Sequence, residues 1–245
     1  MPKDVIVVTG GSRGIGHATC RLLAKQGAAV AVCFHREEKA AQATVEVIVN
    51  SGGIALPFQL SLETPRKLPK IYSNIEQELG PITGLVANAG VLGAQRKVSE
   101  LKGPELKALF AVNTIGPMLC VKEAIKRMST SRGGNGGAIV MVSSVAARLG
   151  GSHGMTGYAA SKGAIETFVR GAALEVSKED IRINAVAPGI TDTDMPPSRI
   201  RTQASHTVPM GRVAEPREVA AAIGWLLSTE SSYLTGTVVP VSGGR

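Results

Sequence analysis

A glycine-rich segment near the start of the chain reads Thr9-Gly10-Gly11-Ser12-Arg13-Gly14-Ile15-Gly16. It follows an apolar run over residues 5–9 and opens an amphipathic stretch, which predicts a strand, a tight turn and a helix. Glycines let the backbone turn sharply and approach a pyrophosphate, while the start of a helix supplies N–H donors and a positive dipole end. The spacing Gly10, Gly14, Gly16 differs from the G-x-G-x-x-G of many dehydrogenases, and an ordinary strand–helix turn would also fit it. The segment indicates nucleotide binding only together with other features.

The rest of the chain repeats this alternation of strand and helix. Apolar runs of strand length cover residues 5–9, 28–33, 54–60, 83–88, 138–143, 182–187 and 237–241. Amphipathic stretches of helix length cover residues 15–26, 37–50, 65–79, 104–128, 158–176 and 216–227. Continuous apolar strands separated by helices are typical of a parallel sheet covered on both faces. We predict an α/β fold, a Rossmann-type doubly wound parallel sheet of about seven strands, in a single domain spanning residues 1–245.

Composition is that of a globular protein, with 44% hydrophobic and 19% charged residues. Cys20, Cys33 and Cys120 have neither a pairing pattern nor metal-ligand spacing, so we expect three reduced thiols and no metal site. No apolar run reaches the roughly 18 residues that a membrane span needs, and the N-terminus lacks the regions of a signal peptide. We therefore expect a cytoplasmic protein without a membrane partner.

The net charge of +8 leaves two kinds of partner open, a nucleic acid and an anionic cofactor or substrate. The basic residues are scattered, without a block of five like charges and without interleaved aromatic residues. We therefore expect no nucleic-acid partner, and a salt-dependent gel shift would test that alternative.

A second group of residues combines Tyr158 and Lys162, four apart on an expected helix, with Ser144 at the end of an expected strand. A tyrosine pKa near 10 makes a poor base at neutral pH, but a nearby ammonium stabilises the phenolate and lowers that pKa. Such a phenol can exchange a proton with a carbonyl or alcohol while a cofactor carries hydride, and the Ser144 hydroxyl can bond the substrate oxygen. Alone, Tyr-x-x-x-Lys would more often be a surface pair.

Taken together, these motifs resemble the short-chain dehydrogenase/reductase family, in its single-domain branch of about this length. The glycine turn, Asn88-Ala89-Gly90, Asn113, Ser144, Tyr158-Ala159-Ala160-Ser161-Lys162 and Pro188-Gly189 follow the family order. The resemblance implies that Asn113, Ser144, Tyr158 and Lys162 are catalytic, with Asn113 holding a water in a proton relay through Lys162. It further implies cofactor contacts from Gly10, Ser12, Arg13, Gly14, Ile15, Gly16, Asn88, Gly90, Tyr158, Lys162, Pro188, Gly189, Ile190 and Thr193. Ser61 departs from the family's frequent acidic residue near the adenine.

The end of the second strand predicts a preference for NADP(H). Family enzymes that use NAD often have an aspartate where this chain has Cys33, and that carboxylate would repel a phosphate. Arg13 and Arg36 are placed to bind the ribose phosphate, and His35 can add a donor when protonated. In the competing interpretation Arg36 only begins a solvated helix face beside Glu37 and Glu38.

The substrate is less defined than the reaction. The chain is most similar to 3-oxoacyl-carrier reductases and sugar or polyol dehydrogenases, which implies a small carbonyl or alcohol substrate and a homotetramer. Glu179 stands where carrier reductases often have arginine, which weakens the case for an acidic carrier partner. We expect substrate contacts from residues 148–157 and 196–209, and a mobile lid over residues 191–212. The alternative is a cofactor-binding regulator without turnover, although such a protein would not need all four catalytic residues.

Overall fold

The fold is seen in a computed structural model, which describes residues 4–196, 202 and 204–245. The expected strands are all present, as a parallel sheet of seven strands in the order β3-β2-β1-β4-β5-β6-β7. The strands are β1 (Val5–Thr9), β2 (Ala29–Phe34), β3 (Ile54–Gln59), β4 (Gly84–Ala87), β5 (Gly137–Val142), β6 (Ile181–Pro188) and β7 (Val238–Val241). The order reverses between β1 and β4, which is where ligands bind in open sheets of this type. The predicted Rossmann-type fold is confirmed.

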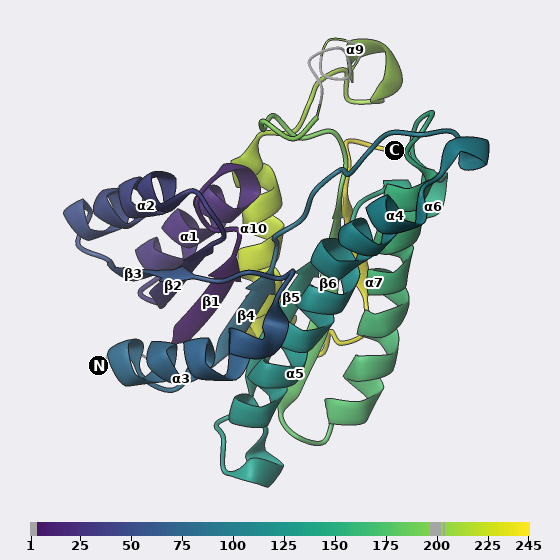
Figure 1. The fold of residues 1–245 in the computed structure, drawn as a ribbon. Coiled ribbons are helices and arrows are strands. Elements are labelled where there is room, and N and C mark those ends of the chain that lie inside the picture. The colour runs from purple at the N-terminus through teal and green to yellow at the C-terminus, as the bar shows by residue number, and fades with distance from the viewer. Residues whose placement is uncertain (1–3, 197–201, 203) are drawn as a thin grey trace.

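Helices cover both faces of this sheet (Figure 1). The main helices are α1 (Gly14–Lys25), α2 (Glu38–Asn50), α3 (Leu68–Leu79), α4 (Gly103–Phe110), α5 (Gly116–Met128), α7 (Thr156–Val176) and α10 (Pro216–Leu227). Two short helices, α6 (Ala146–Leu149) and α9 (Ala204–Thr207), were not predicted. The expected helix over 104–128 is instead α4 and α5 joined by a π-helical turn, Ala111–Ile115. Turns of this kind often mark functional sites.

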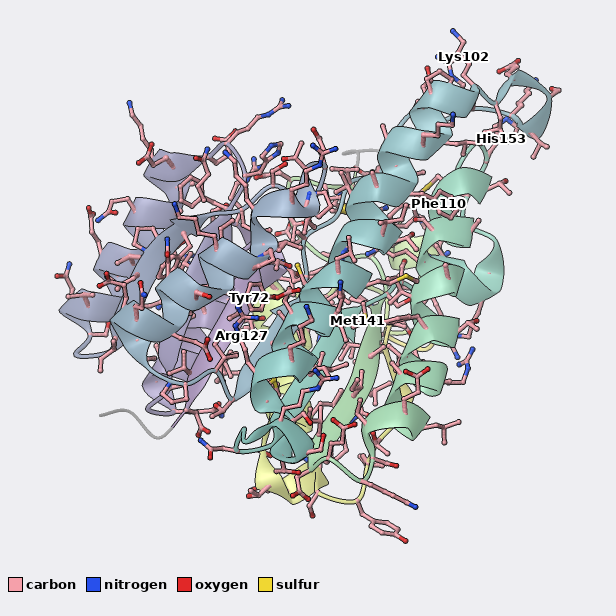
Figure 2. The ribbon with its side chains drawn as sticks, turned by 60° about the horizontal axis from the view of Figure 1, so that its bottom comes forward. Tyr72, Lys102, Phe110, Arg127, Met141 and His153 are labelled. Carbon is pink, nitrogen blue, oxygen red and sulfur yellow. The ribbon has the colours of Figure 1, made fainter. Side chains whose placement is uncertain are left out.

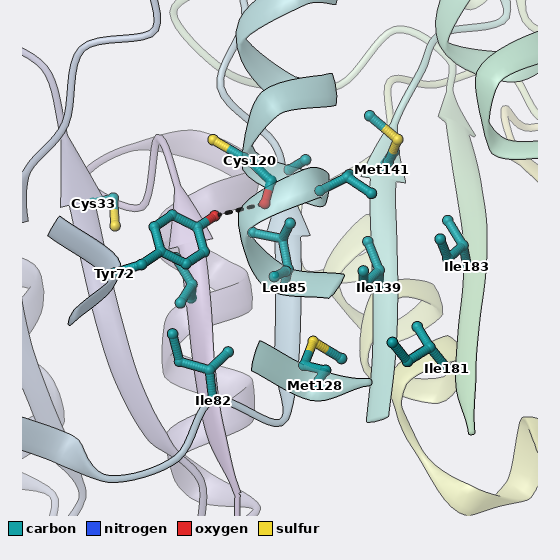
Figure 3. Close-up of a cluster of buried hydrophobic side chains, with 14 of the residues drawn as sticks. Cys33, Tyr72, Ile82, Leu85, Cys120, Met128, Ile139, Met141, Ile181 and Ile183 are labelled. Atoms are coloured by element: carbon teal, nitrogen blue, oxygen red, sulfur yellow. Dashed lines mark hydrogen bonds between the residues drawn. The ribbon is translucent and has the colours of Figure 1, made fainter. Parts of the chain in front are cut away.

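Alternating residues of β1 divide the core into two layers. Ile6 and Val8 pack with the helices α1, α2 and α10, whereas Val5 and Val7 pack with α3, α5 and α7. The second layer contains two of the three cysteines, Cys33 and Cys120, both buried (Figure 3). There the buried Tyr72 hydroxyl donates a hydrogen bond of 3.2 Å to the Cys120 carbonyl. The thiols are free, as expected of reduced cysteines.

Arg127 of α5 connects this helix to α3 through side-chain contacts, and it lies beside Tyr72 (Figure 2). Its guanidinium carbon stands 5.4 Å from the centre of the Tyr72 ring. The same group donates to Glu76 at 3.0 Å and to Glu123 at 2.9 Å, and it also bonds the Pro69 carbonyl at 3.0 Å. One side chain therefore ties two helices through charge, hydrogen bonds and ring contact.

Candidate active site

The glycine turn between β1 and α1 has a backbone that larger residues would disturb. Gly10 and Gly14 have positive φ angles of 64° and 53°, which favour glycine. A Cβ added at Gly16 would lie 2.0 Å from the Gly10 carbonyl oxygen, and one at Gly14 would lie 2.9 Å from Thr193 Cγ2. These contacts require glycine for the turn, which leads into the start of α1, and the N–H groups at a helix start suit a pyrophosphate.

Asn88 holds this turn in place from the end of β4. Its Nδ2 donates to the carbonyls of Thr9 at 3.0 Å and Gly10 at 3.1 Å. In return, the Thr9 hydroxyl accepts hydrogen bonds of 3.0 Å from the backbone N–H groups of Asn88 and Ala89. The amide of Asn88 therefore supports the turn directly, a role that the sequence motif alone did not assign.

A cavity of about 640 Å³ opens beside the turn on the side of β2. Arg13, His35 and Arg36, the residues predicted to bind the phosphate, all line it, together with Gly10, Ser12, Gly14 and Ile15. Carboxylates also lie there, and Asp194 approaches Arg13 at 3.9 Å with both side chains well exposed. Ser61 stands where the family often has an acidic residue near the adenine. Its neighbours Leu60 and Leu62 line this cavity and give it an apolar side.

A second cavity of about 270 Å³ continues from the first, at the carboxyl ends of β4, β5 and β6. The two share the residues Ile15, Asn88, Gly90, Leu92, Thr193 and Met195. The second cavity is lined by Ser144, Tyr158 and Lys162, which the sequence predicted to act together, and by Pro188, Gly189 and Ile190. A single groove thus runs from the glycine turn to Tyr158, with a size and shape that fit a dinucleotide and a small substrate.

Tyr158 and Lys162 enter this cavity from the first turns of α7, and both are buried. The Lys162 ammonium donates to the Val142 carbonyl at 2.8 Å, and burial lowers its pKa from 10.5 to about 8. Burial raises the pKa of the Tyr158 phenol, while a hydrogen bond with the Ser144 side chain acts in the opposite direction. The net pKa of Tyr158 is raised because loss of solvation outweighs the hydrogen bond with Ser144, and the expected lowering by Lys162 stays a prediction.

Asn113 sits behind the cavity and is fully buried in the π-helical turn. Its Oδ1 accepts from the Val91 N–H at 2.8 Å, and its Nδ2 donates to the Val91 carbonyl at 2.8 Å and to Ser161 Oγ at 3.1 Å. A Cβ added at Gly90 would lie 3.3 Å from both Asn113 Oδ1 and Lys162 Nζ. Asn113 therefore lies near Lys162, but its amide is already engaged, and the proton relay remains a prediction.

Several cavity residues were not predicted. From the expected segment 148–157, Leu149, Ser152 and Met155 line the cavity. The structure adds residues that were not expected to contact the substrate, and these are Leu92, Val145, Ala146, Met195 and Arg245. His153, considered from sequence as a polar contact, is exposed at the far end of its loop (Figure 2). Of the expected lid over 191–212, residues 197–201 and 203 lie outside the described part of the chain, whereas Thr193, Pro196 and Thr207 line the cavity.

Comparison with known proteins identifies the family. The family model described as short chain dehydrogenase matches residues 4–204. The chain belongs to the short-chain dehydrogenase family. Among its relatives are an uncharacterized oxidoreductase, YgfF, of Escherichia coli K12, 42% identical over 98% of this chain and 99% of the relative. A 3-oxoacyl-[acyl-carrier-protein] reductase of Homo sapiens is 35% identical over 98% and 97% of the two chains. A crystal structure of a dehydrogenase/reductase from Sinorhizobium meliloti 1021 superposes with a TM-score of 0.93 at 29% identity, covering 100% of this chain and 95% of that one. Membership of the short-chain dehydrogenase family establishes an oxidoreductase acting on CH–OH and C=O groups.

The described residues were also compared with the requirements of a metal site and of a membrane span, and they offer little for either. No group of three or more His, Cys, Asp or Glu side chains is placed to hold a metal ion. One helical segment, Gly103–Met128, is long and apolar enough by composition to cross a membrane. Half of its most apolar part is buried within the molecule, where α5 packs against β4 and α4 against α7, so it is weak evidence for a span.

Proposed function

We propose that this protein is an NADP(H)-dependent oxidoreductase that interconverts a carbonyl compound and a secondary alcohol, with residues 1–245 forming one domain. One observation carries the proposal. The hydroxyls of Ser144 and Tyr158 and the ammonium of Lys162 share a cavity that continues into the groove beside the glycine turn. This arrangement brings a proton donor, an oxygen-binding hydroxyl and a dinucleotide groove together.

The residues of the groove fit a nicotinamide dinucleotide. The turn Gly10–Gly16, including Ser12, Arg13, Gly14 and Ile15, would hold the pyrophosphate, since a side chain at Gly16 would close it. Asn88 and Gly90 shape the middle of the groove, and Pro188, Gly189, Ile190 and Thr193 would hold the nicotinamide carboxamide. When bound, the nicotinamide supplies or accepts the hydride.

Tyr158 is the acid–base group of the proposal. Because burial raises the pKa of its phenol, the group is protonated at neutral pH and can give its proton to a carbonyl oxygen during reduction. Ser144 binds the same oxygen, and Lys162 holds the ribose and returns a proton to Tyr158. Asn113 would hold a water in a proton relay through Lys162, and its Nδ2 also donates to Ser161 Oγ at 3.1 Å.

NADP(H) is favoured over NAD(H) by the charges at the end of β2. Arg13, His35 and Arg36 line that part of the groove, while Cys33 is buried in the core. We expect Arg36→Ala to weaken NADPH binding by about 10-fold or more while changing NADH binding little, because charged hydrogen bonds contribute about 1.5–3 kcal/mol. Arg13→Ala should act similarly, less strongly because Asp194 already approaches Arg13. Fluorescence titration of both cofactors measures this, and an unmutated protein with equal or better kcat/KM for NADH would contradict the assignment.

The names of the relatives suggest where to look for a substrate. They include a carbonyl reductase family member 4 of Danio rerio, 3-oxoacyl-[acyl-carrier-protein] reductases and a cis-4-hydroxycyclohexanecarboxylate dehydrogenase of Sinomonas cyclohexanicum. We propose a small ketone or secondary alcohol for this chain. We also propose a cytoplasmic location, a homotetramer, and no nucleic-acid or membrane partner.

A turnover screen of ketones, 3-oxoacyl thioesters and sugars with both nicotinamides tests the proposed function. At least one carbonyl compound should oxidise NADPH, and Tyr158→Phe should keep NADPH affinity while losing about 10²–10⁴-fold in turnover. Tyr233→Phe is the matched control, because Tyr233 is fully exposed away from the groove. A Tyr158→Phe variant with unmutated turnover would assign the proton transfer elsewhere, and NADPH binding without turnover of any compound would favour a regulator.

A further inference from the structure

The cavity beside Tyr158 has an apolar wall, which begins at Leu92 and Met195, where this cavity meets the one beside the glycine turn. Its side chains come from three separate parts of the chain, and they are Leu92, Val145, Ala146, Leu149, Met155 and Met195. Surfaces of this kind exclude water and favour the hydrocarbon part of a ligand. The wall therefore fits the apolar body of a substrate better than the many hydroxyls of a sugar.

Two polar side chains that also line the cavity, Ser152 and Thr207, make contacts within the protein. The Ser152 hydroxyl donates to Met155 Sδ at 2.9 Å, and Thr207 takes part in an interaction of its own within the molecule. A ligand hydroxyl that lies against the six apolar side chains of the wall finds no hydrogen-bond partner in them, which is costly in a buried site.

Charge in the cavity has a single sign among the residues that the structure describes. Lys162 and Arg245 line it, and none of its described lining residues is a carboxylate. Lys162 lies beside Tyr158, whereas Arg245 lies toward α6 and α9, whose Leu149 and Thr207 line the same cavity (Figure 1). None of the ion pairs between described side chains involves Arg245. The charged side chains of the described residues that line this cavity are therefore both basic.

Arg245 is held at the cavity by a defined turn over residues 242–245. The Ser242 hydroxyl donates to the Arg245 carbonyl at 2.8 Å, and the Met210 N–H donates to the Gly243 carbonyl at 3.1 Å. Gly243 has a positive φ of 65°, and a Cβ there would lie 2.7 Å from Val208 Cγ1. This close packing requires glycine, so the position of Arg245 is built into the structure rather than left to a loose end.

We propose that the substrate is an apolar ketone, or the corresponding alcohol, that carries an anionic group, and that Arg245 binds this group. The inference rests on the proposed function, because it assigns the side of the cavity opposite the cofactor groove to the substrate. A carboxylate on the substrate itself and a phosphate on an attached carrier group share this chemistry, so each needs its own probe.

Matched pairs of anionic and neutral ketones test the proposal. For the carboxylate, 4-oxocyclohexanecarboxylate is compared with 4-oxocyclohexanecarboxamide, and for the phosphate, the acetoacetyl thioester of phosphopantetheine is compared with that of pantetheine. We expect the unmutated protein to prefer the anion in one pair. Arg245→Gln should lower that ratio of kcat/KM by about 10-fold, since a charged hydrogen bond is lost at an exposed arginine. Arg245→Lys should retain part of the preference, and Arg132→Gln, which lies before the amino end of β5 and does not line the cavity, should retain all of it.

Equal kcat/KM for anion and neutral partner in both pairs would overturn the proposal, as would an unchanged ratio in Arg245→Gln. Either result would still be consistent with the proposed oxidoreductase function, because the ketones would be turned over. If none of the four ketones is turned over, the wider turnover screen decides the proposed function, and binding decides the inference separately. Calorimetry of the NADPH-loaded protein with cyclohexanecarboxylate and cyclohexanecarboxamide then gives the answer. Tighter binding of the carboxylate, lost in Arg245→Gln, would support the anion site, and equal binding of both would overturn it.

Discussion

Burial of Lys162 sets the pH range in which its side chain carries a charge. Its pKa is lowered from 10.5 to about 8, so in the folded protein it loses its charge as the pH rises through 8. The buried ammonium costs stability below pH 8, and this cost disappears between 8 and 10.5 as the unfolded chain alone binds the proton. If Lys162 holds the cofactor ribose, NADPH affinity should fall by about 10-fold above that pKa, because a charged hydrogen bond becomes neutral. Fluorescence titration of NADPH from pH 7 to 9.5 measures the effect. Lys162→Met should bind weakly with no such decline, Lys126→Met should behave as the unmutated protein, and a pH-independent affinity would contradict the role.

At the scale of elements, α3 and α5 depend on Arg127 for their attachment to each other. Arg127→Met removes the contacts to Glu76 and Glu123 and leaves the Pro69 carbonyl without this donor. We expect the free energy of unfolding to fall by about 2–3 kcal/mol, less than for a fully buried pair, because Glu76 is partly exposed. Lys126→Met is the matched control on the same helix, since Lys126 is half-exposed and its ammonium pairs with Glu123 at 3.3 Å. Urea denaturation at one protein concentration compares the variants, and equal losses for both would show that the ring and helix contacts of Arg127 contribute nothing.

The whole molecule offers a surface suited to self-association. Ala172 and Ala173 of α7 pack in the chain's own core, but a Cβ added at Gly163 or Gly171 would meet nothing within 4 Å. Leu174 on the same helix is 79% exposed. These glycines are thus not needed for packing on the sheet, which favours a close helix pair between copies. We expect light scattering at micromolar concentration to give four times the chain mass. Leu174→Glu should yield smaller species while Val47→Glu, on exposed α2, should not, and a monomeric unmutated protein would contradict the prediction.

The strands and the main helices could be predicted because each carries its own periodicity. The π-helical turn at Asn113 could not, since the apolar pattern continues through residues 104–128 without a break. The four-residue helices α6 and α9 are too short to show a period. In the site, the spacing of Tyr158 and Lys162 on one helix predicted their shared cavity. Arg245 and Leu92 reach that cavity from distant segments, and their position follows only from the way the strands are ordered.

The three buried cysteines have a practical consequence for spectroscopy. Burial raises the pKa of every thiol, that of Cys120 to about 12, and thiolates are the form that reacts with maleimides. The three native cysteines of the folded chain should therefore react little with maleimides, so they need not be replaced before a new cysteine is labelled. A dye attached through Met210→Cys would sit on an exposed residue whose backbone bonds Gly243, beside Arg245, and its fluorescence would test whether this segment moves when cofactor and substrate bind.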